Sequence, residues 1–129
     1  MGPAGHVHAF EPDPIARAIL YDNVMKNEYA NVKVERLALS NTKGEARLSA
    51  EVFGQSESSM LPHGVSKAQV REIAIETTTV DDYCRENRVI PNGVKIDAEG
   101  AEDLVIEGSR GIIETYRHWM LVEFDPLRY

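Results

Sequence analysis

A strand, a helix and a second strand follow one another near the start of the chain, and this order restricts the possible folds more than any other feature. Residues His6–Phe10 alternate in character as a short strand does. Asp13 is a good N-cap, and Pro14 suits the first position of a helix. Asn31–Leu39 then reads as the next strand. Two strands joined by a helix over this length lie parallel with a right-handed crossover, so we expect an α/β fold.

The helix between these strands runs to about Lys26 and carries an apolar stripe, which we expect to lie in the core. The stripe consists of Ile15, Ala16, Ile19, Leu20 and Val24. Further on, Glu45–Val52 and Val70–Thr77 alternate as two more strands, and we expect a small antiparallel insertion there. The loop Phe53–Gln69 between them is rich in Gly and Ser, and such a long loop inside a domain is often functional. Within it, His63 is either a base or an ordinary solvated histidine.

The second half of the chain continues with helices and strands. Thr79 caps a short helix. Pro91-Asn92-Gly93 breaks the chain before the next strand. A helix over Ala101–Glu107 ends at Gly108, and Trp119–Phe124 is a final strand.

Acidic residues follow the predicted buried strand Val94–Ile96. Asp97 and Glu99 stand where this strand ends, and Gly100 permits a sharp exit into the helix that begins near Ala101. Ligands of open α/β sheets bind beyond the carboxyl ends of the strands, so these acids are candidate site residues. The alternative is that they only cap the helix and favour its positive end.

Glu11, Asp97 and Glu123 each stand at or near the carboxyl end of a predicted parallel strand. If these strands share a sheet, the three carboxylates line one rim. A carboxylate in the position of Glu11 accepts hydrogen bonds from both hydroxyls of a ribose. However, no G-x-G-x-x-G run precedes Glu11, where nucleotide sites carry their glycine-rich loop. Three carboxylates on one rim are not a specific metal signature, so we predict no metal site.

Composition excludes several classes of partner and location. A net charge of −7 argues against nucleic acid, because binding to phosphates requires Lys and Arg, and it suits a cationic ligand better. No apolar run approaches the roughly 20 residues of a membrane span, and the N-terminus lacks the regions of a signal peptide. The single cysteine, Cys84, fits a reducing compartment and a packing role. We therefore expect one cytoplasmic domain over residues 1–129, with residues 1–5 disordered or an expression remnant.

Several runs, in order, resemble the FkbM family of S-adenosylmethionine-dependent methyltransferases. They are His8–Pro14, Asn31–Val34, Leu37–Ser40, Ser58–Met60, Thr79–Tyr83, Lys95–Glu102 and Leu121–Phe124. The resemblance implies a partial class I methyltransferase (Rossmann-like) fold, a mostly parallel sheet with helices on both faces. The family's first strand and glycine-rich cofactor loop would lie before His6, so we expect a domain truncated at its N-terminus.

The same resemblance implies a cofactor site. Glu11 would hold the ribose of S-adenosylmethionine, and Ala38 and Leu39 would flank its adenine. An acidic rim is compatible with this cofactor because its sulfonium is a cation.

Catalytic roles follow from the resemblance as well. Asp97 and Glu99 would lie near the methionine part of the cofactor and the hydroxyl of the acceptor. Either of them, or His63, is a candidate base for the hydroxyl proton. Lys95 shares a strand face with Asp97, so it pairs with a carboxylate there either for function or as an ordinary structural ion pair.

Three functions remain in view. The first is an O-methyltransferase domain that acts on a hydroxyl of a small molecule or sugar and is impaired in its truncated form. The alternative is a noncatalytic oligomeric or interaction module that keeps the fold, and the third is another nucleotide-binding α/β protein. Because a missing first strand would expose sheet edges, we expect a dimer or another homo-oligomer.

Overall fold

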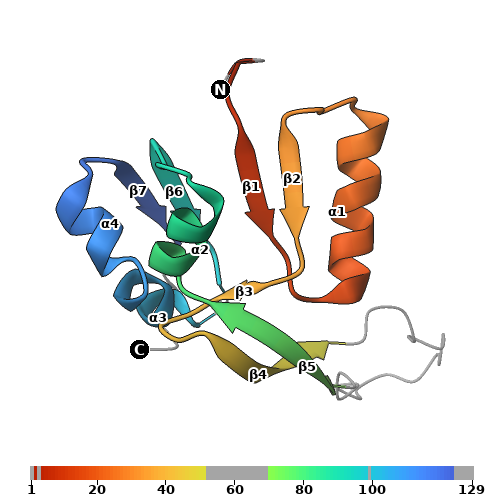
Figure 1. Cartoon of the computed structure of the whole chain (residues 1–129). Coiled ribbons are helices and arrows are strands. Elements are labelled where there is room, and N and C mark those ends of the chain that lie inside the picture. Colours follow the sequence, from red (N-terminus) through yellow and green to blue (C-terminus); the bar gives the residue numbers. More distant parts are fainter. Residues whose placement is uncertain (1, 3, 52–69, 99, 124–129) are drawn as a thin grey trace, which may run out of the picture.

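The computed structural model describes residues 2, 4–51, 70–98 and 100–123, which form an alternation of strands and helices (Figure 1). In chain order the elements are β1 (Val7–Phe10), α1 (Pro14–Lys26), β2 (Val32–Glu35), β3 (Ala38–Leu39), β4 (Gly44–Glu51), β5 (Val70–Thr78), α2 (Val80–Asn87), β6 (Gly93–Ile96), α3 (Glu102–Glu107), α4 (Arg110–Thr115) and β7 (Trp119–Val122). The α/β class is confirmed. No helix in these ranges is long and apolar enough to cross a membrane.

The first unit is the predicted strand–helix–strand arrangement. β1 and β2 pair in parallel, with Val7 opposite Val32 and Phe10 opposite Glu35. Asp13 is the N-cap of α1, and its side chain accepts a hydrogen bond from the backbone N–H of Ile15. Local sequence signals therefore predict both the elements and their connection.

The expected burial of the apolar stripe on α1 is confirmed for Val24 and in part for Ala16 and Leu20, but it is wrong for Ile15 and Ile19. Val24 is buried, but Ile15 is 57% exposed and Ile19 is 60% exposed. In the part of the chain that the structure describes, α1 lies beside a sheet of two strands, β1 and β2 (Figure 1). Helical spacing shows which residues share a face, but it does not show whether another element covers that face.

The predicted strand Asn31–Leu39 is in fact two strands in different sheets. β2 stays with β1, whereas β3 pairs in parallel with β5, with Ala38 opposite Thr77. β4 and β5 pair antiparallel, which confirms the predicted insertion. The alternating pattern runs through the break because both pieces are strands, so periodicity alone does not locate the change of sheet.

The second half of the chain holds the core. β6 and β7 pair in parallel, and α2, α3 and α4 lie close to this pair (Figure 1). The buried apolar cluster comprises Val80, Cys84, Ile96, Val105 and Ile112, which confirms the packing role of Cys84. The three parallel pairings, β1–β2, β3–β5 and β6–β7, thus lie in three separate sheets within the described residues, rather than in the single sheet that we expected.

One side chain of α2 connects the two halves. The ring of Tyr83 makes edge-on contacts with His8 and Phe10 on β1, at centroid distances of 5.5 and 4.7 Å. Its hydroxyl donates to Oε1 of Glu35, 2.6 Å away. With 5% of its surface exposed, Tyr83 fixes α2 against the β1–β2 pair.

Candidate functional site

Glu11 lies immediately beyond the carboxyl end of β1. Its backbone N–H donates to the carbonyl of Glu35 at 3.0 Å, which continues the ladder one residue past the strand. Its side-chain Oε1 accepts from the backbone N–H of Asp13 at 2.9 Å. The carboxylate therefore has a defined place at the end of the sheet, where ligands of α/β folds bind.

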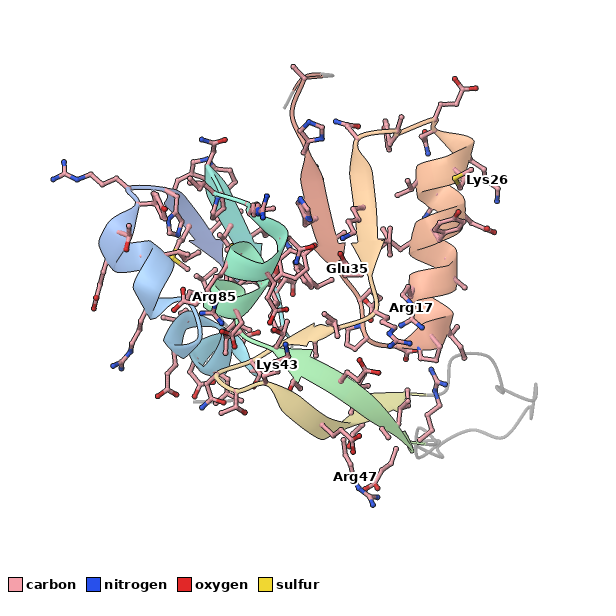
Figure 2. All side chains as sticks on the ribbon, viewed as in Figure 1. Arg17, Lys26, Glu35, Lys43, Arg47 and Arg85 are labelled. Atoms are coloured by element: carbon pink, nitrogen blue, oxygen red, sulfur yellow. The ribbon has the colours of Figure 1, made fainter. Side chains whose placement is uncertain are left out.

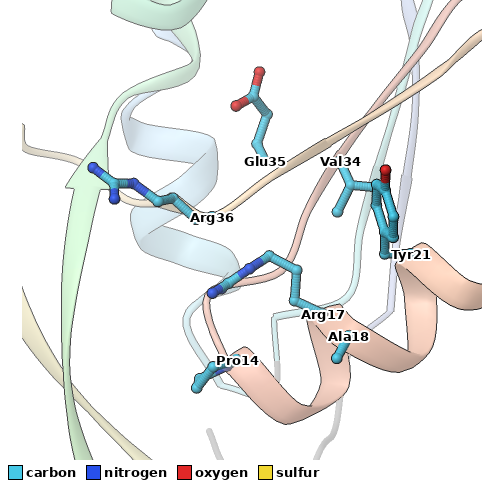
Figure 3. Close-up of a pocket in the computed structure, with 7 residues that line it drawn as sticks. All are labelled: Pro14, Arg17, Ala18, Tyr21, Val34, Glu35 and Arg36. Carbon is cyan, nitrogen blue, oxygen red and sulfur yellow. The ribbon is translucent and has the colours of Figure 1, made fainter.

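Arg17 holds the same loop from α1. Its Nη1 donates to the carbonyls of Glu11 and Pro12, at 2.9 Å each. Figure 3 shows this side chain reaching from α1 toward the chain that joins β1 to α1. The loop that carries the acid is thus fixed by its own helix.

An open pocket of about 500 Å³ lies between α1 and the end of β2 (Figure 3). Its lining residues are Pro14, Arg17, Ala18, Tyr21, Val34, Glu35 and Arg36. A second pocket, of about 340 Å³, shares Pro14, Arg17 and Arg36 with it and extends along β5. Arg36 donates to Glu76 at 3.0 Å, and Arg17 donates to the carbonyl of Glu11, so the guanidinium groups of both arginines already have protein partners. The pockets alone therefore indicate no ligand class.

Lys95 and Asp97 form an ion pair at the end of β6. Nζ of Lys95 lies 2.7 Å from Oδ2 of Asp97, and these side chains are 54% and 41% exposed. The predicted pairing of Lys95 with a carboxylate is confirmed. The hydrogen bond to Asp97, together with the charges of Asp97 and Glu123, raises the pKa of Lys95 against the opposing effect of desolvation. An exposed pair of this kind contributes little to stability.

Glu102 is a buried acid next to the candidate site, and its contacts were not predicted from the sequence. It is 3% exposed, and its carboxylate accepts from the backbone N–H groups of Ala98 at 2.9 Å and Gly100 at 3.0 Å. Gly100 has φ 102°, a left-handed conformation that glycine adopts without strain, which confirms its predicted role in the turn. The turn after Asp97 is therefore wrapped around a buried carboxylate. A glutamate in the first turn of a helix, two residues after a glycine, is the signal that could have pointed to this contact.

The acidic strand ends fall into two groups. Asp97 and Glu123 follow the paired strands β6 and β7, and the N–H of Glu123 donates to the carbonyl of Ile96 at 2.9 Å. Within the described residues, Glu11 follows β1, which pairs with β2 in a separate sheet. The three acids therefore do not share one hydrogen-bonded sheet. In the described residues, no group of three His, Cys, Asp or Glu side chains is placed to hold a metal ion.

The remaining candidates have different surroundings. Ala38 lies opposite Thr77, and Leu39 packs against the buried apolar cluster. Glu99, His63 and the run Ser58–Met60 lie outside the described residues. Their roles stay predictions, as do those of the other site residues.

Comparisons with known proteins give the family. The family model of the methyltransferase FkbM domain matches residues 1–129. The crystal structure of methyltransferase FkbM from Methylobacillus flagellatus KT has a similar fold, with a TM-score of 0.54 and 17% sequence identity. The match covers 91% of this chain and 25% of that chain, so this chain spans a quarter of the length of that protein. A search among curated proteins finds no match. The domain match over the whole chain shows that this protein belongs to the FkbM methyltransferase domain family.

Proposed function

We propose that this chain acts as an S-adenosylmethionine-dependent O-methyltransferase domain on a hydroxyl of a small molecule or sugar. Membership of the family supports methyl transfer as the class of reaction. The observation that carries the proposal is the carboxylate of Glu11, held beyond the end of β1 by the N–H of Asp13. An acid in this position is suited to a ribose.

The residues present fit the cofactor. An ionised carboxylate has about four lone-pair sites, and the N–H of Asp13 occupies one on Glu11, so acceptor capacity remains for two ribose hydroxyls. When bound, S-adenosylmethionine supplies an electrophilic methyl group on a sulfonium. The acidic character of the chain, with a net charge of −7, favours a ligand with that positive centre.

On the acceptor side, we assign the proton transfer to the acidic turn after β6. Asp97 carries an exposed carboxylate whose orientation is held by Lys95. Such a group can accept a hydroxyl proton or orient the hydroxyl for attack. Glu99, in the same turn of the sequence, remains the second candidate base.

The test is calorimetric titration with S-adenosylhomocysteine. We expect micromolar binding by the wild-type chain and a loss of at least about tenfold in Glu11→Ala, because a charge-assisted hydrogen bond contributes roughly that much. Glu114→Ala is the matched control, since it makes the same change of charge at an exposed position of α4. A folded wild-type chain without binding, or a Glu11→Ala variant that binds like the wild type, would contradict the proposal.

A second candidate function is a noncatalytic module that keeps the fold and associates with itself. The observation in its favour is that β1 pairs only with β2, and β6 only with β7, within the described residues. Each strand therefore has an edge to which another strand can add. Self-association without binding of S-adenosylhomocysteine would favour this function over the first.

A further inference from the structure

The loop between β1 and α1 is also held from the antiparallel insertion. Arg71, on β5, pairs with Oδ1 of Asp13 through a hydrogen bond between charged groups. The two side chains are 29% and 15% exposed, so the pair is largely shielded from water. The two residues are 58 positions apart in the sequence and lie in different parts of the fold. The contact therefore ties the hairpin sheet to the loop of the candidate site.

Asp13 connects this ion pair to Glu11. Its side chain accepts from Arg71 and from the N–H of Ile15 at 2.8 Å, while its own backbone N–H donates to Oε1 of Glu11. Burial works against ionisation of Asp13, but the hydrogen bond and charge of Arg71 and the N–H of Ile15 outweigh it and lower the pKa of this carboxyl. Asp13 thus accepts a hydrogen bond from Arg71 with its side chain and donates one to Glu11 with its backbone N–H.

The helix cap alone does not require Arg71. An N-cap aspartate needs only a backbone N–H of the first turn, which Ile15 supplies here. A second, charged partner restricts the side chain of Asp13 further, and with it the peptide N–H that orients Glu11. A binding carboxylate has to be held within about 0.5 Å of its working position, and supporting contacts of this kind provide that precision.

We infer that Arg71 is a positioning residue, which acts through Asp13 to fix the carboxylate of Glu11 for the ribose hydroxyls of the cofactor. This inference rests on the proposed function. It makes the β4–β5 hairpin a support of the cofactor site, although none of its described residues lies in the β1–β2 pair that precedes Glu11.

The chain offers a closely matched control. Arg47 lies on β4 of the same hairpin and pairs with Glu72 at 2.8 Å, with both side chains well exposed. In Figure 2 this side chain extends away from α1 and from the loop after β1. Arg47→Ala therefore removes an arginine–carboxylate ion pair from the same hairpin without touching Asp13.

A first experiment measures positioning without any ligand, as amide hydrogen exchange of Asp13 by NMR. In Arg71→Ala the exchange of this N–H should become several-fold faster, while the amide of Ile96 in β6 reports on global stability. Arg71→Lys, which keeps a cation near Asp13, should restore most of the protection. Arg47→Ala should leave Asp13 unchanged. Equal exchange at Asp13 in the wild type and Arg71→Ala would overturn the inference whatever the cofactor does.

A second experiment repeats the titration with S-adenosylhomocysteine on the same variants. We expect Arg71→Ala to bind about tenfold more weakly, Arg71→Lys to lie in between, and Arg47→Ala to match the wild type. Binding by the wild type with no change in Arg71→Ala would overturn the inference and leave the proposed function standing. Absence of binding by the wild type would overturn the proposed function, and with it the role of Arg71 toward the cofactor.

Discussion

Among single side chains, the hydrogen-bonded chain through Tyr83 fixes protonation states that the sequence does not reveal. The hydroxyl of Tyr83 has one proton, which goes to Glu35, a carboxylate that also accepts from Lys33 at 2.7 Å. Nδ1 of His8 lies 2.6 Å from the same hydroxyl. Because the Tyr83 proton goes to Glu35, the hydroxyl oxygen accepts here, and Nδ1 of His8 is the protonated nitrogen that donates to it. Burial, followed by the charge of Lys33, lowers the pKa of His8 against the opposing effect of Glu35. Burial and the hydrogen bond to Glu35 raise the pKa of Tyr83.

The first prediction concerns the dependence of stability on pH. Because the pKa of His8 is lower in the folded chain than its ordinary value of 6.5, the unfolded chain takes up the proton more readily as pH falls. The contribution of His8 is therefore fully present above pH 6.5 and is lost as pH falls below it. The urea concentration at the midpoint of unfolding should decrease as the pH is lowered from 7.5 to about 5.5. His8→Asn, which keeps a side-chain N–H without titrating, should remove the part of this decline that is due to His8. Parallel profiles for the two proteins would contradict this assignment.

Where helices and strands meet, close packing sets a constraint at the end of α3. Gly108 is the C-cap of this helix, and a Cβ atom there would lie 2.1 Å from the carbonyl oxygen of Ser40. Its φ of −73° is open to any residue, so the constraint is space rather than backbone conformation. The carbonyl of Gly108 also accepts from the N–H of Asp81 at 3.0 Å. The end of α3 is thus pressed between the chain after β3 and the start of α2.

We therefore predict that Gly108→Ala lowers the free energy of unfolding by about 1–3 kcal/mol, the usual effect of overpacking. Gly44→Ala is the control, because a Cβ at this position in β4 meets no atom within 4 Å. It should be neutral or stabilise by up to about 1 kcal/mol. Urea unfolding of both variants tests this, and similar losses in the two would argue against the close approach at Ser40.

The elements themselves could be read from the sequence because their signals are local. Asp13 and Thr79 cap the helices that were predicted for them, each through a hydrogen bond to a nearby N–H. Contacts between distant segments could not be read in this way. The pairing of Arg71 with Asp13 and the change of sheet after Glu35 depend on where β5 lies, and no period in either segment encodes that.

The candidate site was predictable to a similar extent. The position of Glu11 at a strand end followed from the alternation of β1 and the caps of α1. The buried contacts of Glu102 did not, because a glutamate is mostly exposed in proteins and only the turn around Gly100 makes its burial favourable.

Taken as one molecule, the chain has an uneven distribution of buried apolar surface. The buried cluster lies with α2, β6, α3 and α4, while α1 exposes Ile15, Ile19 and Met25. Within the described residues, the β1–β2 and β6–β7 pairs have open edges as well. Trp119 and Glu123 donate to the carbonyls of Asn92 and Ile96, and bonds within a parallel ladder involve alternate residues. The peptide N–H of Lys95 on β6 therefore faces the side of that strand away from β7.

These open edges carry the last prediction, that the chain associates with itself. Light scattering after gel filtration should give a mass that rises with concentration from 14.4 kDa toward about twice that value, as expected for a dimer formed by edge strands. Lys95→Pro removes the outward N–H of β6 and keeps the ladder to β7, so it should shift the equilibrium toward monomer if β6 is the edge that pairs. Lys95→Ala is the control, because it also breaks the ion pair with Asp97 but keeps the N–H. A decrease in mass in both variants would show that the association depends on the Lys95 side chain rather than on the edge of β6. A constant 14.4 kDa for the wild type at high concentration would rule out self-association, and the exposed strand edges would then have to be tolerated in solution by a monomer.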